Sequence, residues 1–335
     1  MNTKQKKYIT TWLYSGLFLV ALMVIIGGIT RLTNSGLSMV EWKLIRGSVP
    51  PLNNIQWQET FEKYQKFPEY QKINKGMTLS EFKFIFFWEY LHRLLGRIIG
   101  LVFIIPFIVF WNKNWLNPKQ KRQLLILLSL GILQAFLGWF MVKSGLVNVP
   151  AVSHYRLAIH LITAFGLMCY IYWLILSINE IEKKTNSKIH KISNWFIIAL
   201  IIQIIYGAFV AGLKAGYLLP SSNLIEAVFG YTIRYNSNIN LLNNSFDIQA
   251  FHRLFAWGIF LISIIIYHKT KNTPLKNIGK KILFLVIIQI LLGITTLILR
   301  VPTHTAIAHQ FIALLILLYT VRLNYLSSKT SLSDS

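Results

Sequence analysis

Long apolar runs separated by short polar stretches dominate the 335-residue chain. A helix needs about 20 mainly apolar residues to cross a bilayer, and eight runs are long enough. They lie at roughly 10–30, 84–111, 122–142, 154–178, 193–213, 248–268, 281–299 and 305–326. We expect the first run to be a retained helix, because it is too long for a signal peptide and no small-x-small cleavage site follows it. The pattern predicts an all-α polytopic membrane protein with eight transmembrane helices.

The composition agrees with this pattern, since 54% of the residues are hydrophobic and 13% are charged. A net charge of +23 is typical of some nucleic-acid-binding proteins. Here the basic residues lie in short stretches between apolar runs, so we interpret them as topology signals and expect no nucleic-acid partner. They concentrate in the amino terminus and in the second, fourth and sixth connections, which predicts that both termini are cytoplasmic. A bacterial inner membrane is the simplest location.

The first connection, about 31–83, is too long to weigh in that rule and is expected to form a periplasmic cap. It is interrupted by Pro50 and Pro51 and contains interfacial aromatic residues such as Trp42 and Trp57. Its last segment, Thr78-Leu-Ser-Glu81, resembles a capping box that opens the second long helix. A solvated linker is the alternative interpretation of this segment.

An internal repeat divides the eight spans into two sets of four. Residues 88–96 resemble residues 248–256, and residues 132–138 resemble residues 287–293. We therefore predict two parallel four-helix bundles, 1–178 and 193–335, joined by a cytoplasmic linker at 179–192. A pseudo-two-fold axis along the membrane normal would relate them, because each repeat has an even number of spans.

Four histidines occupy repeat-related positions near the outer ends of even-numbered spans: His92, His160, His252 and His309. A single histidine of this kind is more often a satisfied core residue, but four at equivalent depth favour a function. Cys169 is the only cysteine, and carboxylate or thiolate partners do not occur at comparable depth in both halves, so paired imidazoles fit axial ligation of a haem iron better than zinc. One helical turn after each histidine is a small residue that leaves room for a flat ring: Gly96, Ala164, Ala256 and Ala313.

Charged residues beside these histidines differ between the halves. Arg93 and Arg253 directly follow a histidine and are candidate partners for haem propionates, with snorkelling to the interface as the alternative. Glu89 lies three residues before His92, whereas the equivalent position holds Gln249. A carboxylate beside a ligand is suited to proton transfer, so the first half is expected to do chemistry and the second to carry electrons. The alternative for Glu89 is a helix-entry glutamate.

Several stretches closely resemble the haem A synthase family, in the form shared by mitochondria and many Gram-negative bacteria. They are Gly28-Ile-Thr-Arg-Leu-Thr-Asn-Ser-Gly-Leu-Ser38, Pro50-Pro51, Met77-Thr-Leu-Ser-Glu-Phe-Lys83, Trp88-Glu-Tyr-Leu-His-Arg93, Gly207-Ala-Phe-Val-Ala-Gly212 and His309-Gln310. The likeness covers nearly the whole chain.

The resemblance implies an oxidoreductase that converts a ring methyl of haem o into a formyl group, giving haem a for cytochrome oxidase. It implies a haem b cofactor at His252 and His309, and a substrate haem at His92 and His160 with Glu89 as the key carboxylate. It also implies a link to haem O synthase and to cytochrome oxidase assembly, with an electron donor that the sequence does not name. Some members of the family carry a cysteine pair in outer loops, which this chain lacks.

The residues by themselves support a membrane protein with two haems, and two other classes compete with the enzyme. A cytochrome b-type electron-transfer protein would hold both haems permanently and normally arranges them across the membrane. All four histidines are expected on one side, which argues against that class. A transporter is suggested by the repeats, but the spans lack paired mid-membrane acids.

Overall fold

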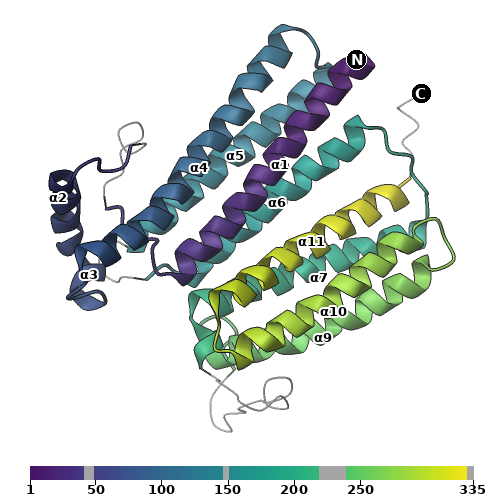
Figure 1. The fold of residues 1–335 in the computed structure, drawn as a ribbon. Helices are drawn as coiled ribbons and strands as arrows, with labels where there is room; N and C mark the ends of the chain where they lie inside the picture. Colours follow the sequence, from purple (N-terminus) through teal and green to yellow (C-terminus); the bar gives the residue numbers. More distant parts are fainter. Residues whose placement is uncertain (41–48, 146–150, 219–238, 330–335) are drawn as a thin grey trace. The chain divides into compact units, whose positions relative to one another are not determined.

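The computed structural model describes residues 1–40, 49–145, 151–218 and 239–329, and within these ranges the chain forms helices and loops but no strand. Eight helices are long and apolar enough to cross a membrane, which confirms the predicted class (Figure 1). They are α1 (Thr3–Leu32), α4 (Leu79–Asn112), α5 (Pro118–Gly145), α6 (His154–Ile178), α7 (Ser187–Gly212), α9 (Ser245–Thr270), α10 (Lys276–Ile298) and α11 (Thr303–Ser327). Trp42 lies outside the described residues.

Most helices extend beyond the apolar runs because polar caps start them earlier. α4 begins at Leu79 with the predicted capping box: Thr78 and Glu81 satisfy each other's backbone N–H groups. α7 begins at Ser187, inside the predicted linker 179–192, because the side chain of Asn186 accepts a hydrogen bond from the backbone N–H of Ile189.

The chain divides into two compact units, Ser15–His160 and Met1–Tyr14 together with Leu161–Ser335. In the second unit, α7, α9, α10 and α11 form a closed four-helix bundle in which each helix packs on two others. In the first unit, α4 packs against α5, and Gly27 of α1 contacts His92 of α4. The predicted domain boundaries and the pseudo-two-fold axis stay predictions.

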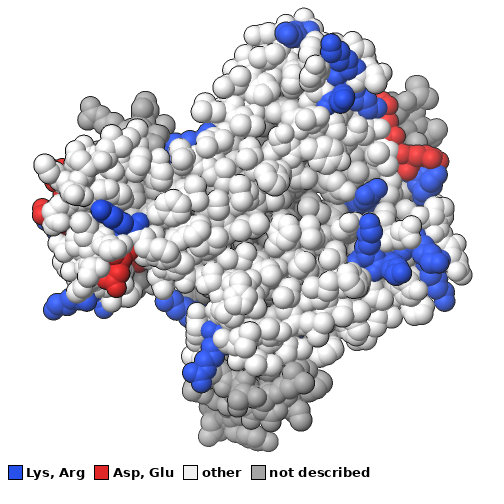
Figure 2. Space-filling model, in the orientation of Figure 1, with Lys and Arg blue, Asp and Glu red and all other residues white. Residues whose placement is uncertain are grey.

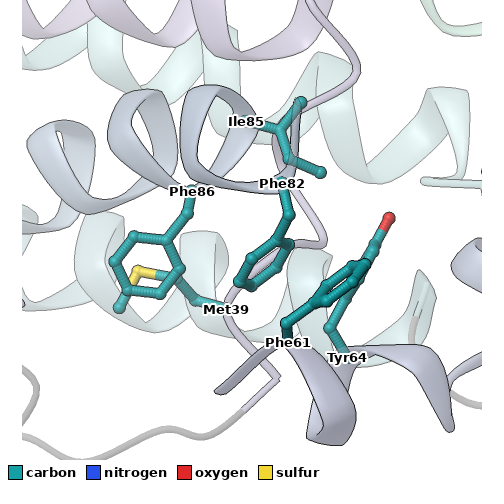
Figure 3. Packing of buried hydrophobic residues seen from close by; sticks show 6 residues of the cluster. All are labelled: Met39, Phe61, Tyr64, Phe82, Ile85 and Phe86. Carbon is teal, nitrogen blue, oxygen red and sulfur yellow. The ribbon is translucent and has the colours of Figure 1, made fainter. Parts of the chain in front are cut away.

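The first connection contains two short helices, α2 (Asn54–Gln65) and α3 (Pro68–Lys72), and an aromatic core of its own. We call this core the cap cluster: Met39, Phe61, Tyr64, Phe82, Ile85 and Phe86 (Figure 3). Trp57 packs edge-on against Phe86 with ring centroids 5.1 Å apart. The cap therefore has a packed interior that includes the start of α4, which a solvated linker would not have.

Charged side chains gather near helix ends and on the cap. Broad stretches along the helices show none of them in the view of Figure 2. One ion pair joins the two chain segments of the larger unit, since Lys6 Nζ lies 2.9 Å from Glu180 Oε2. The distribution is that of a multi-pass membrane protein.

Candidate functional site

Each of the four proposed ligand histidines packs against a glycine of the helix that precedes it. Gly27 of α1 faces His92, Gly138 of α5 faces His160, Gly207 of α7 faces His252, and Gly293 of α10 faces His309. In every case a Cβ on the glycine would lie 3.0 Å from the imidazole Cε1, which is closer than side chains normally pack. The missing side chain is therefore what lets each ring lie between two helices.

Three of these histidines also contact a glutamine placed one turn before the glycine. Gln134 Nε2 lies 3.1 Å from His160 Nδ1, Gln203 Nε2 lies 3.2 Å from His252 Nδ1, and Gln289 Nε2 lies 3.2 Å from His309 Nε2. Gln134 and Gln203 each donate a second hydrogen bond of 3.0 Å to the main-chain carbonyl of the histidine that they contact. A second contact links α10 and α11, where His309 Nδ1 donates to the carbonyl of Gln289 at 3.1 Å.

His92 is the exception. The residue one turn before Gly27 is Met23, whose terminal methyl carbon would lie 3.1 Å from a Cβ on Gly96. His92 Nδ1 is buried and has no hydrogen-bond partner among the described residues, and the same holds for Trp88 Nε1, one turn earlier on α4. His92 Nδ1 and Trp88 Nε1 are therefore two buried nitrogen atoms that a bound molecule could satisfy.

Within each unit the structure brings the predicted ligands together in pairs. His92 and His160 both belong to the unit Ser15–His160, and His252 of α9 and His309 of α11 both belong to the four-helix bundle of the other unit. Across the described ranges no group of three His, Cys, Asp or Glu side chains could hold a metal ion. The donor sets are thus imidazole pairs, which suit a metal whose other ligands come from a macrocycle.

Glu89 and Arg93 form a buried ion pair on α4. Glu89 Oε1 lies 2.5 Å from Arg93 Nη2, and the two side chains are 4% and 8% exposed. Ser38 Oγ and the backbone N–H of Met39 each donate to Glu89 Oε2 at 2.7 Å, while Arg93 donates to the Met39 carbonyl at 2.9 Å. Arg93 is therefore held inside the protein by Glu89 instead of snorkelling to the interface.

The cap holds this ion pair in place. Met39 belongs to the cap cluster together with Ile85 and Phe86 of α4, and its main chain contacts both members of the pair. Neither contact could be expected from sequence spacing, because 50 residues separate Met39 from Glu89. Glu89 is thus fixed by a loop whose position depends on the aromatic core of the cap.

Gln249 stands in the second bundle where Glu89 stands in the first, and it has a different partner. Gln249 is buried, and its Nε2 donates to the Ala215 carbonyl at 3.0 Å. Gln249 Oε1 has no hydrogen-bond partner within the described part of the chain. The predicted difference between Glu89 and Gln249 is therefore a difference between a buried ion pair and a neutral amide contact.

These residues fit a porphyrin in each bundle. Glycines bring helices close to the imidazole rings, and the space over Gly96, one turn after His92, is filled only by the flexible end of the Met23 side chain. Each bundle has buried polar atoms without a partner among the described residues, such as His92 Nδ1 in the first and Gln249 Oε1 in the second, which a bound group could satisfy. The glycines and glutamines of the preceding helices were missed in the sequence, although Gln-x-x-x-Gly at 134–138, 203–207 and 289–293 was a readable signal.

An eight-span membrane protein with paired histidines in its helix bundles is the class that fold and site define. Residues 10–321 match the cytochrome oxidase assembly protein family, COX15-CtaA. The chain is 43% identical over 331 residues to a protein named Heme A synthase of Flavobacterium johnsoniae, covering 94% of this chain and 96% of that one. The Heme A synthase of Flavobacterium psychrophilum is 44% identical over 334 residues, with 95% and 97% covered. That of Brucella suis is 38% identical over 328 residues, with 96% and 92% covered. The chain belongs to the COX15-CtaA family.

Proposed function

We propose that this chain is a haem A synthase, an oxidoreductase that converts a ring methyl of haem o into the formyl group of haem a. The observation that carries the proposal is identity of 38–44% over nearly the full length of proteins named Heme A synthase. The family description supports a role of the product in cytochrome oxidase assembly. A di-haem electron-transfer cytochrome, the alternative from sequence, is not favoured by these relatives.

The substrate haem is assigned to the first bundle, between His92 and His160. One observation supports this choice: the buried ion pair of Glu89 lies on α4, three residues before His92. The second bundle offers an amide in place of the carboxylate. The first bundle is therefore the one with a group that can exchange a proton.

Glu89 is the proposed catalytic residue. Removing electrons and protons from a ring methyl makes that carbon electron-poor, and a fixed carboxylate stabilises it or accepts its proton. Ser38, Arg93 and the Met39 N–H hold the carboxylate oxygens in one orientation, so little reorganisation accompanies the reaction.

His252 and His309 are proposed to hold a resident haem b in the second bundle. When bound, this haem would supply one-electron transfer. The protein's part is to keep both rings in place: the Gln203 amide contacts the His252 ring, and the Gln289 carbonyl accepts a hydrogen bond from His309 Nδ1. Arg253 and Arg93 remain candidate propionate partners; Nη2 of Arg93 already donates to Glu89 and to the Met39 carbonyl.

We propose that the protein lies in the bacterial inner membrane with both termini in the cytoplasm. The lysines of the even-numbered connections and of the amino terminus support this orientation. Its expected neighbours are a haem O synthase that supplies the substrate, the assembly machinery of cytochrome oxidase, and a redox partner that exchanges electrons with the second bundle.

Pigment analysis tests the proposal. The protein is purified from cells that supply haem o, its haems are extracted, and their masses are determined. We expect haem b together with a farnesylated haem that carries a methyl or a formyl group. Haem b alone, at two equivalents per chain, would identify the electron-transfer cytochrome instead. The His92→Ala variant is the matched control, since it should lose the farnesylated haem and keep haem b.

A further inference from the structure

The four proposed ligand histidines differ in the side chains that contact their rings. These side chains come from the odd-numbered spans. Gln203 is placed four residues before Gly207, the glycine that faces His252. Met23 has the same spacing to Gly27, the glycine that faces His92. By the internal repeat, α1 corresponds to α7, so Met23 stands in the first bundle where Gln203 stands in the second.

The amide of Gln203 fixes the His252 ring relative to its helix. Its Nε2 contacts both Nδ1 of the ring, at 3.2 Å, and the main-chain carbonyl of the same residue, at 3.0 Å. In this arrangement Nδ1 accepts and Nε2 carries the ring proton. Ligation through Nε2 would place the ring proton on Nδ1. The amide of Gln203, whose Oε1 lacks a partner among the described residues, would then turn to accept this proton and give up its contact with the His252 carbonyl.

The Met23 thioether cannot donate a hydrogen bond to a ring nitrogen, and it accepts one only weakly. Its methyl packs over Gly96. His92 Nδ1 accordingly has no partner in the described part of the chain. His160, the other proposed ligand of the first bundle, is held by Gln134 in the same way as His252 is held by Gln203.

We propose that Gln203 is a positioning residue that keeps His252 on the resident haem, whereas Met23 leaves His92 as the ligand that releases the substrate iron. The inference rests on the proposed function, because it takes the imidazoles as haem ligands. The proposal explains how one chain can hold one haem firmly and release the other. A substrate has to enter and its product has to leave, so one of its two ligands must detach, while a resident haem needs two ligands that stay.

Exchange of the two residues tests the proposal, with carbon monoxide as the probe. The reduced iron of a haem binds carbon monoxide only when one axial ligand leaves. Gln203→Met is measured in protein that contains haem b alone, and Met23→Gln in protein loaded with haem o. Outer-shell partners of metal ligands typically change affinity 10- to 100-fold. We expect carbon monoxide binding by haem b to strengthen by that factor in Gln203→Met, and binding by haem o to weaken by that factor in Met23→Gln.

Met23→Leu is the control for packing, because it keeps an apolar side chain over Gly96 and adds no amide. It should bind carbon monoxide as the unchanged protein does. Affinities within twofold of the unchanged protein in both exchange variants would overturn the proposal. If the haem b spectrum survives His252→Ala, the ligand assignment under the proposed function has failed instead, so the two failures can be told apart.

Discussion

Glu89 differs in charge from its counterpart Gln249 in the second bundle, and the groups around it decide what a substitution there can reveal. Its carboxylate is the counter-ion of the buried Arg93 and accepts hydrogen bonds from Ser38 and Met39. Removing one member of a buried pair typically costs about 3–5 kcal/mol, because the other charge is left uncompensated. Loss of activity after removal of the Glu89 carboxylate would therefore have two explanations, the lost chemistry of Glu89 and the uncompensated charge of Arg93.

We predict that Glu89→Gln binds haem o and keeps haem b but lowers the yield of haem a at least about 10²-fold, the range of general acid–base groups. The variant copies Gln249, which this chain already combines with Arg253 in the second bundle. Pigment analysis of cells that express the variant is the measurement. A normal yield of haem a would reduce Glu89 to the structural counter-ion of Arg93.

The double variant Glu89→Gln with Arg93→Gln separates chemistry from charge balance. It removes both charges and leaves no unpaired ion in the site. If Glu89 serves only as the partner of Arg93, the double variant should recover haem a; the catalytic role requires that it stays as inactive as the single variant.

At the scale of helices, glycines facing histidines set how closely neighbouring spans approach. We predict that Gly207→Ala displaces the His252 ring, because the new Cβ would lie 3.0 Å from its Cε1. The bis-imidazole spectrum of haem b should weaken or be lost, which absorption spectroscopy of the purified protein measures. Gly258→Ala in α9 is the matched control, since nothing lies within 4 Å of its Cβ and alanine favours a helix interior by about 1 kcal/mol. Equal haem b spectra in the two variants would contradict this role of Gly207.

The cap depends on a buried phenol. Tyr64 donates to Glu69 at 3.2 Å and accepts from Asn74 at 2.7 Å. Burial and the neighbouring Glu69 carboxylate raise the pKa of Tyr64 well above its usual range. The neutral phenol is therefore the folded form, and its contribution is present below the pKa of an unfolded tyrosine, about 10, and lost as the pH rises beyond it.

Tyr64→Phe is expected to lower the stability of the cap by about 1–3 kcal/mol, the cost of leaving buried polar partners unsatisfied. Protease cleavage within the cap should be faster near neutral pH in the variant. Above pH 10 the difference should shrink, because the unchanged protein then loses the contribution of the phenol as well. Cleavage rates that match at every pH would show that Tyr64 does not hold the cap.

Elements and ligands differ in how far the sequence could predict them. Length and hydropathy predicted all eight spans, and repeat positions predicted the four histidines, because a buried imidazole is rare in an apolar helix. The glycines and glutamines behind them were harder to find, since lipid-facing and bundle-facing sides of these helices are both apolar and periodicity does not separate them. The contact of Ser38 and Met39 with Glu89 joins residues about 50 positions apart, which only the folded cap reveals.

For the whole molecule, the distribution of lysines predicts the orientation in the membrane. A reporter that fluoresces only in the cytoplasm should be bright when fused after Ser335 and dark when inserted in the cap near Leu52. Leu52 is exposed, so the insertion disturbs little of the cap cluster. Removing Lys4, Lys6 and Lys7 controls for the amino-terminal charges. A bright signal from the cap would reverse the assigned topology and place the four histidines on the cytoplasmic side.

The central claim is that one chain holds two haems for different purposes, a substrate in the first bundle and a resident cofactor in the second. The absorption spectra and extracted haems of His92→Ala and His252→Ala, compared side by side, test it most directly. The account predicts that His92→Ala abolishes haem a and keeps the bis-imidazole spectrum of haem b, whereas His252→Ala removes that spectrum. Loss of haem b in His92→Ala with continued formation of haem a would contradict the account and exchange the roles of the two bundles.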